Sequence, residues 1–253
     1  MTDGKGYKMS LKFITFLCLL VLVAGCSTTS NIKKAPETYF KEGQDFYAKG
    51  NYEEAVNRWK KVKESYSSPL LTTVVELKIA DAHFSSKSYI EAAAEYENFR
   101  KLHPNNEKAS YALFRLGLCH YNQMTRIDTD PAPLKNATTA FETFLKEYPG
   151  SGLSGDVREK LELCRTRESR YEIYVGRFYL RTAQYISAIT RLTGAIQKFP
   201  TSPANDEGLL YLGQAYIEVG ERTKAKEALE RLLKEYKSSK LADKARKLLA
   251  ETA

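Results

Sequence analysis

The feature that most constrains the fold of this chain is a helical pattern that recurs five times. In each copy a small residue on the second predicted helix is followed four positions later by a bulky one. The small residues are Ala55, Ala92, Ala137, Ala188 and Ala225, and the bulky ones are Trp59, Tyr96, Phe141, Leu192 and Leu229. A pattern that returns at intervals of 37, 45, 51 and 37 residues predicts stacked helical hairpins.

A second set of small residues recurs on the first helix of each hairpin. These residues are Gly43, Ala80, Gly117, Gly176 and Gly213. Gly and Tyr on the first helix, with Ala and Phe on the second, are typical of the tetratricopeptide repeat of about 34 residues. The pairs His103-Pro104, Tyr148-Pro149 and Phe199-Pro200 are expected to end second helices. The sequence therefore predicts an all-α fold, a tetratricopeptide-repeat superhelix of five helical hairpins plus a C-terminal capping helix.

Two segments explain the irregular spacing. Residues Thr125–Leu134 read as a polar insertion inside repeat 3, and Asp156–Thr182 as one unusually long first helix in repeat 4. Residues Lys240–Glu251, rich in Lys and Leu, suit the polar-faced capping helix.

The first 25 residues are typical of a secretory signal. Lysines precede the apolar run Phe13–Val23, which is too short to span a bilayer, since a spanning helix needs about 20 residues. Val23-Ala24-Gly25-Cys26 resembles the lipobox of bacterial lipoproteins, in which cleavage before the Cys leaves Cys26 acylated. Ser27, in place of Asp, suggests sorting to the outer membrane by analogy with such lipoproteins. An ordinary signal peptide with a chance Cys is the alternative, and Met9 is an alternative start.

These features divide the chain into four segments. We expect a lipoprotein signal peptide over residues 1–25, a lipidated linker over 26–37, repeats 1–3 over 38–151, and repeats 4–5 with the capping helix over 152–253.

The charge pattern argues against nucleic-acid binding. The formal net charge is +8, but Lys and Glu alternate as they do on solvated helix faces. No basic patch is interleaved with stacking aromatics.

No arrangement of residues suggests catalysis. The chain has three histidines, His83, His103 and His120, and none forms the i, i+4 pair of a helical zinc site. Asp128 and Asp130 lack the Gly and Glu of a calcium loop, and there is no Gly-rich phosphate loop or nucleophile elbow. We therefore predict a chain that is not an enzyme, with no catalytic residues, no metal and no cofactor. Cys119 and Cys164 are expected to be buried thiols, and a disulfide between them stays open.

The positions of residues relative to the small residue on each first helix predict which side chains line the concave face of the array. Repeats 1–3 place aromatic and aliphatic residues there, which predicts a peptide-binding groove. Its predicted residues are Phe40, Tyr47, Leu77, Phe84, Phe114, Leu118 and Tyr121. Repeat 4 instead places Arg177 and Arg181 there. The alternative, that the aromatic rings pack on neighbouring helices, stays open.

Several motifs in this order resemble the BamD (ComL) family of outer-membrane lipoproteins. They are the lipobox, Tyr39 and Gly43 with Tyr52 and Ala55, Tyr111 to Tyr121 before the insertion, and the run from Glu172 to Arg191. The resemblance implies a factor of the β-barrel assembly machine, anchored in the outer membrane and facing the periplasm. It implies three kinds of partner: the periplasmic (POTRA) domains of a BamA-like barrel protein, other assembly-machine lipoproteins, and unfolded outer-membrane protein precursors.

The resemblance also implies a division of labour along the chain. Repeats 1–3 would hold precursor segments, and repeats 4–5 would dock on the machine, with Arg191 as the docking residue that the motif implies. The projected Arg177 and Arg181 are predicted to dock with it. Arg191 would pair with an acidic residue of the partner, although Thr190 stands where the family commonly has Asn. The alternative is that Arg191 is a solvated arginine on a second helix. The alternative function is another periplasmic repeat adaptor, one that serves secretin or pilus assembly, the Tol-Pal system or peptidoglycan enzymes.

Overall fold

The described chain is helical throughout. The computed structural model describes residues 34–65, 68–124 and 130–252, and those from Pro36 onward form one compact unit. This part holds eleven helices and no strand. The predicted signal peptide and the lipidation site Cys26 lie outside the described residues.

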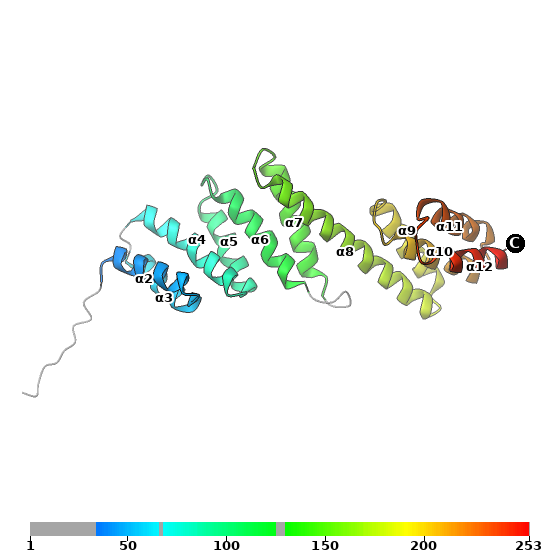
Figure 1. The fold of residues 1–253 in the computed structure, drawn as a ribbon, viewed down its shortest axis with the longest axis horizontal. Helices are drawn as coiled ribbons and strands as arrows, with labels where there is room; N and C mark the ends of the chain where they lie inside the picture. The colour runs from blue at the N-terminus through cyan, green and yellow to red at the C-terminus, as the bar shows by residue number, and fades with distance from the viewer. Residues whose placement is uncertain (1–33, 66–67, 125–129, 253) are drawn as a thin grey trace, which may run out of the picture. The chain divides into compact units, whose positions relative to one another are not determined.

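Ten helices pair into five antiparallel hairpins, as the repeat pattern predicts. The hairpins are α2 (Pro36–Ala48) with α3 (Tyr52–Glu64), α4 (Pro69–Ser85) with α5 (Tyr89–Leu102), α6 (Ala109–Gln123) with α7 (Ala132–Glu147), α8 (Ser154–Arg181) with α9 (Tyr185–Lys198), and α10 (Asn205–Glu218) with α11 (Arg222–Glu235). The last helix, α12 (Ala242–Thr252), packs against α11. Each helix follows its predecessor side by side (Figure 1), so the tetratricopeptide-repeat prediction is confirmed.

A contact between a small and a large residue closes each hairpin. A Cβ atom added to Gly117 would lie 2.4 Å from the ring of Phe141, and one added to Gly43 would lie 2.3 Å from the Trp59 indole. Leu192 and Leu229 approach Gly176 and Gly213 in the same way. In repeat 2, Ala80 and Tyr96 are fully buried in one core. The bulky side chain of the second helix therefore occupies the space that the first helix leaves empty.

The turn inside four of the hairpins uses a left-handed backbone. Gly50 and Gly220 have φ angles of 77° and 78°, a conformation in which glycine is unstrained. Lys87 and Ala183 occupy the matching places in repeats 2 and 4 with φ angles of 63° and 57°. The turn geometry is thus retained where the sequence has lost its glycine.

The 28-residue helix α8 belongs to two hydrophobic cores. Its first half buries Val157, Leu161 and Cys164 in the core of repeats 2 and 3. Its second half buries Ile173 in the core that repeats 4 and 5 share with α12. At 1.5 Å per residue the helix is about 42 Å long, whereas α7 beside it has only 16 residues.

Two predicted boundaries need correction. Of the expected insertion Thr125–Leu134, residues 125–129 lie outside the described residues, but Ala132–Leu134 form the first turn of α7 and Leu134 is buried. The apolar side chain of Leu134 explains why this end is helical. The last helix begins at Ala242 rather than Lys240.

We predict opposite effects for two Gly→Ala changes. Gly117→Ala should destabilise the fold by about 1–3 kcal/mol, because the new methyl group meets the fully buried Phe141. Gly194→Ala is the matched control, since Gly194 lies inside α9 with nothing within 4 Å of its added Cβ. It should stabilise the fold by up to about 1 kcal/mol. Urea unfolding followed by far-UV circular dichroism measures both, and an equal shift in both variants would contradict the close-packing account.

Candidate functional site

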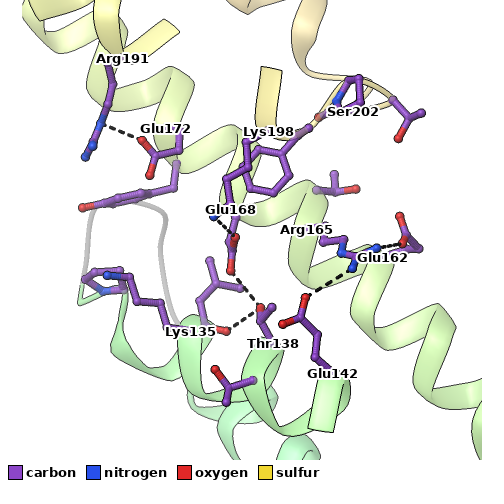
Figure 2. A pocket seen from close by; sticks show the side chains of 18 residues that line it. Lys135, Thr138, Glu142, Glu162, Arg165, Glu168, Glu172, Arg191, Lys198 and Ser202 are labelled. Atoms are coloured by element: carbon purple, nitrogen blue, oxygen red, sulfur yellow. Dashed lines mark hydrogen bonds and ion pairs between the residues drawn. The ribbon is translucent and has the colours of Figure 1, made fainter. Parts of the chain in front are cut away.

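A large cleft in the described chain lies over the middle of α8. It has a volume of about 920 Å³, and its walls come from α7, α8, α9 and the turn that follows α9. Figure 2 shows that charged and hydroxyl side chains from these helices point into it. The cleft opens where α8 continues beyond the end of repeat 3.

Glu168 joins the three helices around this cleft. Its carboxylate accepts a hydrogen bond from the Thr138 hydroxyl of α7 at 3.0 Å, and it pairs with the Lys198 ammonium of α9 at 3.1 Å. Only 15% of the Glu168 side chain is exposed. A carboxylate held on two sides in this way ties repeat 3 to repeat 4.

Further ion pairs line the same cleft. Arg165 contacts Glu142 across the cleft at 3.4 Å and Glu162 on its own helix at 2.9 Å. Arg191 Nε lies 2.7 Å from Glu172 Oε2 (Figure 2). Half-exposed pairs of this kind contribute about 0–1 kcal/mol each. The cleft therefore offers charged groups that a partner could contact, and Arg165, Arg191 and Lys198 among them are already paired within the chain.

The predicted docking arginines lie in different places. Arg191 lines the cleft described above. Arg177 lines a smaller one, of about 290 Å³, between α8 and the start of α10, where its guanidinium lies 5.5 Å from the centre of the Tyr211 ring. Arg181 is exposed on the last turn of α8. The structure does not bring Arg177 and Arg191 into one cleft.

The predicted groove residues of repeats 2 and 3 are half-buried and contact other side chains. The Arg115 guanidinium lies 3.8 Å from the centre of the Phe84 ring, and Tyr89 packs edge-on against it. Phe114 contacts the rings of Phe141 and Phe144. Leu77, Leu118 and Tyr121 pack against the same core. These contacts fix the orientation of the predicted groove residues.

The groove residues of repeat 1 are held in the same manner. The Tyr47 ring packs against Tyr52 and Trp59, and its hydroxyl lies 2.8 Å from the Ser85 hydroxyl of repeat 2. The backbone carbonyl of Phe40 accepts a hydrogen bond from the Trp59 indole.

A partly buried polar network lies between repeats 2 and 3. The Asp81 carboxylate accepts hydrogen bonds from the hydroxyls of Tyr96 and Tyr111, and Arg115 donates to the Tyr111 hydroxyl. Burial, followed by the charge of Asp81, raises the pKa of both tyrosines. Both hydroxyls therefore stay protonated and keep donating to Asp81.

Sequence counting missed two pairs of exposed apolar side chains on first helices. Leu70 and Val74 precede the predicted Leu77 on α4 and are 77% and 39% exposed. Tyr174 and Phe178 on α8 are 42% and 53% exposed. The sequence does carry a signal for these residues, because the two members of each pair are four positions apart and therefore lie on one face of a helix.

His83 on α4 and His120 on α6 are half-buried. Burial lowers the pKa of His83 and of His120. Over residues 34–65, 68–124 and 130–252, no three His, Cys, Asp or Glu side chains gather as metal ligands would. In the same ranges no helix is both long and apolar enough to cross a bilayer.

The five closed hairpins and their solvent-facing clefts define a tetratricopeptide-repeat scaffold, a class of protein that binds other proteins. A family model described as "YfiO: Outer membrane lipoprotein" matches residues 32–232, which include helices from all five hairpins. The chain belongs to this family of outer membrane lipoproteins.

The chain is also similar to two proteins named BamD and to a solved structure. The outer membrane protein assembly factor BamD of Caulobacter vibrioides is 27% identical over 84% of this chain and 72% of its own length. The BamD of Vibrio cholerae is 26% identical over 85% of this chain and 97% of its own length. A solved structure of yeast Sti1, a TPR2AB-domain:pHSP90 complex, matches with a TM-score of 0.41 and 15% identity, covering 86% of this chain and 98% of that chain.

We predict that Cys119 and Cys164 resist thiol reagents in the folded protein. Both are free and buried, and burial raises the pKa of Cys119 to about 12 and that of Cys164 to about 11. Neither should be alkylated by iodoacetamide at pH 8 until urea is added, as measured by peptide mass mapping. Above about pH 9 the unfolded chain ionises these thiols and the native chain does not, so stability should fall as pH rises towards 11. A disulfide-linked pair of peptides would contradict this prediction.

Proposed function

We propose that this chain is a non-catalytic outer membrane protein assembly factor. In this proposal, repeats 1–3 hold unfolded outer-membrane protein precursors. Repeats 4 and 5 dock on the periplasmic domains of a BamA-like barrel protein and its accessory lipoproteins. The observation that carries the proposal is the family match, because it extends over the repeat array rather than over one generic hairpin. The relatives named as assembly factors support it.

Attachment to the outer membrane is part of the proposal. The lipobox-like Val23-Ala24-Gly25-Cys26 and the lipoprotein family match both support a lipid on Cys26. Several acyl chains on one residue anchor a protein stably, since two lipid signals already suffice. The repeats would then face the periplasm, where precursors arrive.

The first half of the array offers an apolar surface for an extended segment. The half-buried Leu77 lies one turn beyond the exposed Val74 on α4. The rings of Phe40, Tyr47, Phe84, Phe114 and Tyr121 are already oriented by their neighbours, so binding a peptide would cost little further ordering. A segment rich in aromatic and aliphatic side chains fits such a surface.

We predict that Leu70→Ala with Val74→Ala weakens precursor binding at least about tenfold. Burying an aliphatic side chain contributes about 1.5–3 kcal/mol, and both residues are exposed, so the fold should not change. Fluorescence anisotropy with a synthetic peptide that alternates apolar residues and ends in an aromatic one measures the effect. Leu102→Ala, at a residue that is 57% exposed on a second helix, is the control. Equal affinity in all three proteins would exclude α4 from the binding surface.

The second half offers charged groups for docking. Arg191 is 43% exposed and lies in the large cleft, where Glu172 holds its guanidinium. A carboxylate of a partner could replace or join Glu172, because a guanidinium has five N–H donors. Arg177 and Arg181 would extend the contact on other faces of the same repeat.

We predict that Arg191→Ala reduces co-purification of a large β-barrel protein from outer membranes in mild detergent, whereas Glu172→Gln does not. The first change removes the cation, and the second removes only its partner within the chain. Loss of the exposed pair should change stability by less than about 1 kcal/mol, so reduced co-purification reports docking.

Mass spectrometry of the wild-type pull-down tests the proposed function itself. A stoichiometric β-barrel protein with repeated periplasmic domains would support it. A secretin, a Tol-Pal component or a peptidoglycan enzyme in its place would instead identify another repeat adaptor.

A further inference from the structure

Two exposed aromatic side chains form a short row on the second half of α8. Tyr174 is 42% exposed and Phe178 is 53% exposed. Their spacing of four residues places them on one face of the helix, one turn apart. Exposed apolar surface of this kind usually marks a binding site when polar groups surround it.

The row is uncovered because of the length of α8. The main neighbours of α8 are α7, α9 and α10. The α7 contacts include Thr138 with Glu168, near the middle of the helix. Further along, Leu192 of α9 covers the face of Gly176, and Gly208 of α10 approaches Ile173. Tyr174 lines the small cleft between α8 and the start of α10, and Phe178 is 53% exposed one turn further along the helix.

Two arginines flank the aromatic row. Arg170 lies four residues before Tyr174, and Arg181 lies three residues after Phe178, so all four residues share one face of α8. All four are exposed. Within the part of the chain that the structure describes, neither arginine has an ion-pair partner within 4.0 Å. We call Arg170, Tyr174, Phe178 and Arg181 the α8 surface.

The acidic residues on this part of α8 are paired with residues of α7 and α9, outside the α8 surface. Glu168 is held by Lys198 and Thr138, and Glu172 is held by Arg191. Asp206 and Glu207 at the start of α10 line the small cleft beside Arg170. The α8 surface is therefore cationic, with acidic groups on the α10 side only.

We propose that the α8 surface binds an acidic amphipathic helix of a partner protein. Arg170 and Arg181 are eleven residues apart, which is about 16 Å along the helix. A partner helix of about three turns would match this length. Two apolar side chains one turn apart would cover the rings of Tyr174 and Phe178, and a carboxylate at each end would meet a guanidinium. This inference rests on the proposed docking role of repeat 4, to which Arg181 belongs, but it does not depend on which machine the chain serves.

A linear protein segment fits this surface better than an anionic membrane does. The charges and rings stand in a single row along one helix, whereas a lipid surface contacts a broad basic face.

Photo-crosslinking in intact cells tests the proposal with the full lipidated chain. Phe178 is replaced by p-benzoylphenylalanine, and the crosslinked segment is identified by peptide mapping. The same experiment is run with Arg170→Glu and Arg181→Glu together. Arg158→Glu is the control, because it reverses an exposed charge on the first half of α8. Far-UV circular dichroism verifies that each variant folds.

The expected adduct joins residue 178 to a protein segment that has carboxylates on both sides of a pair of apolar residues. Its yield should fall at least tenfold in the double charge reversal and stay unchanged in the control. An adduct that survives the charge reversal, an adduct with lipid or with a segment lacking carboxylates, or no adduct at all would overturn the proposal. Because the pull-down that tests the proposed function uses the wild-type chain, the two experiments can fail separately.

Discussion

The close approach of two helices at one small residue is the interaction on which the rest of this structure depends. Where Gly117 meets Phe141 and Gly43 meets Trp59, a methyl group would not fit. The same contact, made with Leu192 and Leu229, closes the hairpins of repeats 4 and 5. Because each hairpin closes in the same way, first helices follow first helices along the array, and their free faces form the surfaces available to partners.

Helix α8 is where this regular arrangement changes. It buries Val157 and Leu161 with repeat 3 and Ile173 with repeat 5, so one rigid helix connects two cores. Its extra length leaves a cleft between α7 and α9 that a regular repeat would fill. Charged residues such as Glu168 cross this cleft instead of apolar ones. The two halves of the array are thus joined by one continuous helix and by a few polar contacts.

The sequence predicted the fold in more detail than the site, for a physical reason. Small and bulky residues at fixed intervals report contacts inside one hairpin, so the helices and the long α8 could be read from them. Which side chain covers Phe84, or which carboxylate holds Arg191, depends on contacts between elements, and the periodic pattern does not encode those contacts. Arg115 lies over the Phe84 ring, and Glu172 pairs with Arg191. Tyr174 and Phe178 were missed because counting from Gly176 assumed a regular repeat. They flank the counted positions Ile173 and Arg177, and the length of α8 leaves them uncovered.

The acidic and the basic residues on the second half of α8 lie on different faces of the helix. This separation affects how α8 can bind a partner. Glu168 and Glu172 face the second-helix side, where Lys198 and Arg191 neutralise them and hold the junction together. Arg170 and Arg181 remain on the exposed face beside two aromatic rings. A ligand on the exposed face would bury apolar area and neutralise those arginines without breaking the ion pairs on the opposite side. Partner binding and the connection between the two cores therefore use different residues of the same helix, so the scaffold can take up a partner while the array keeps its shape at the junction.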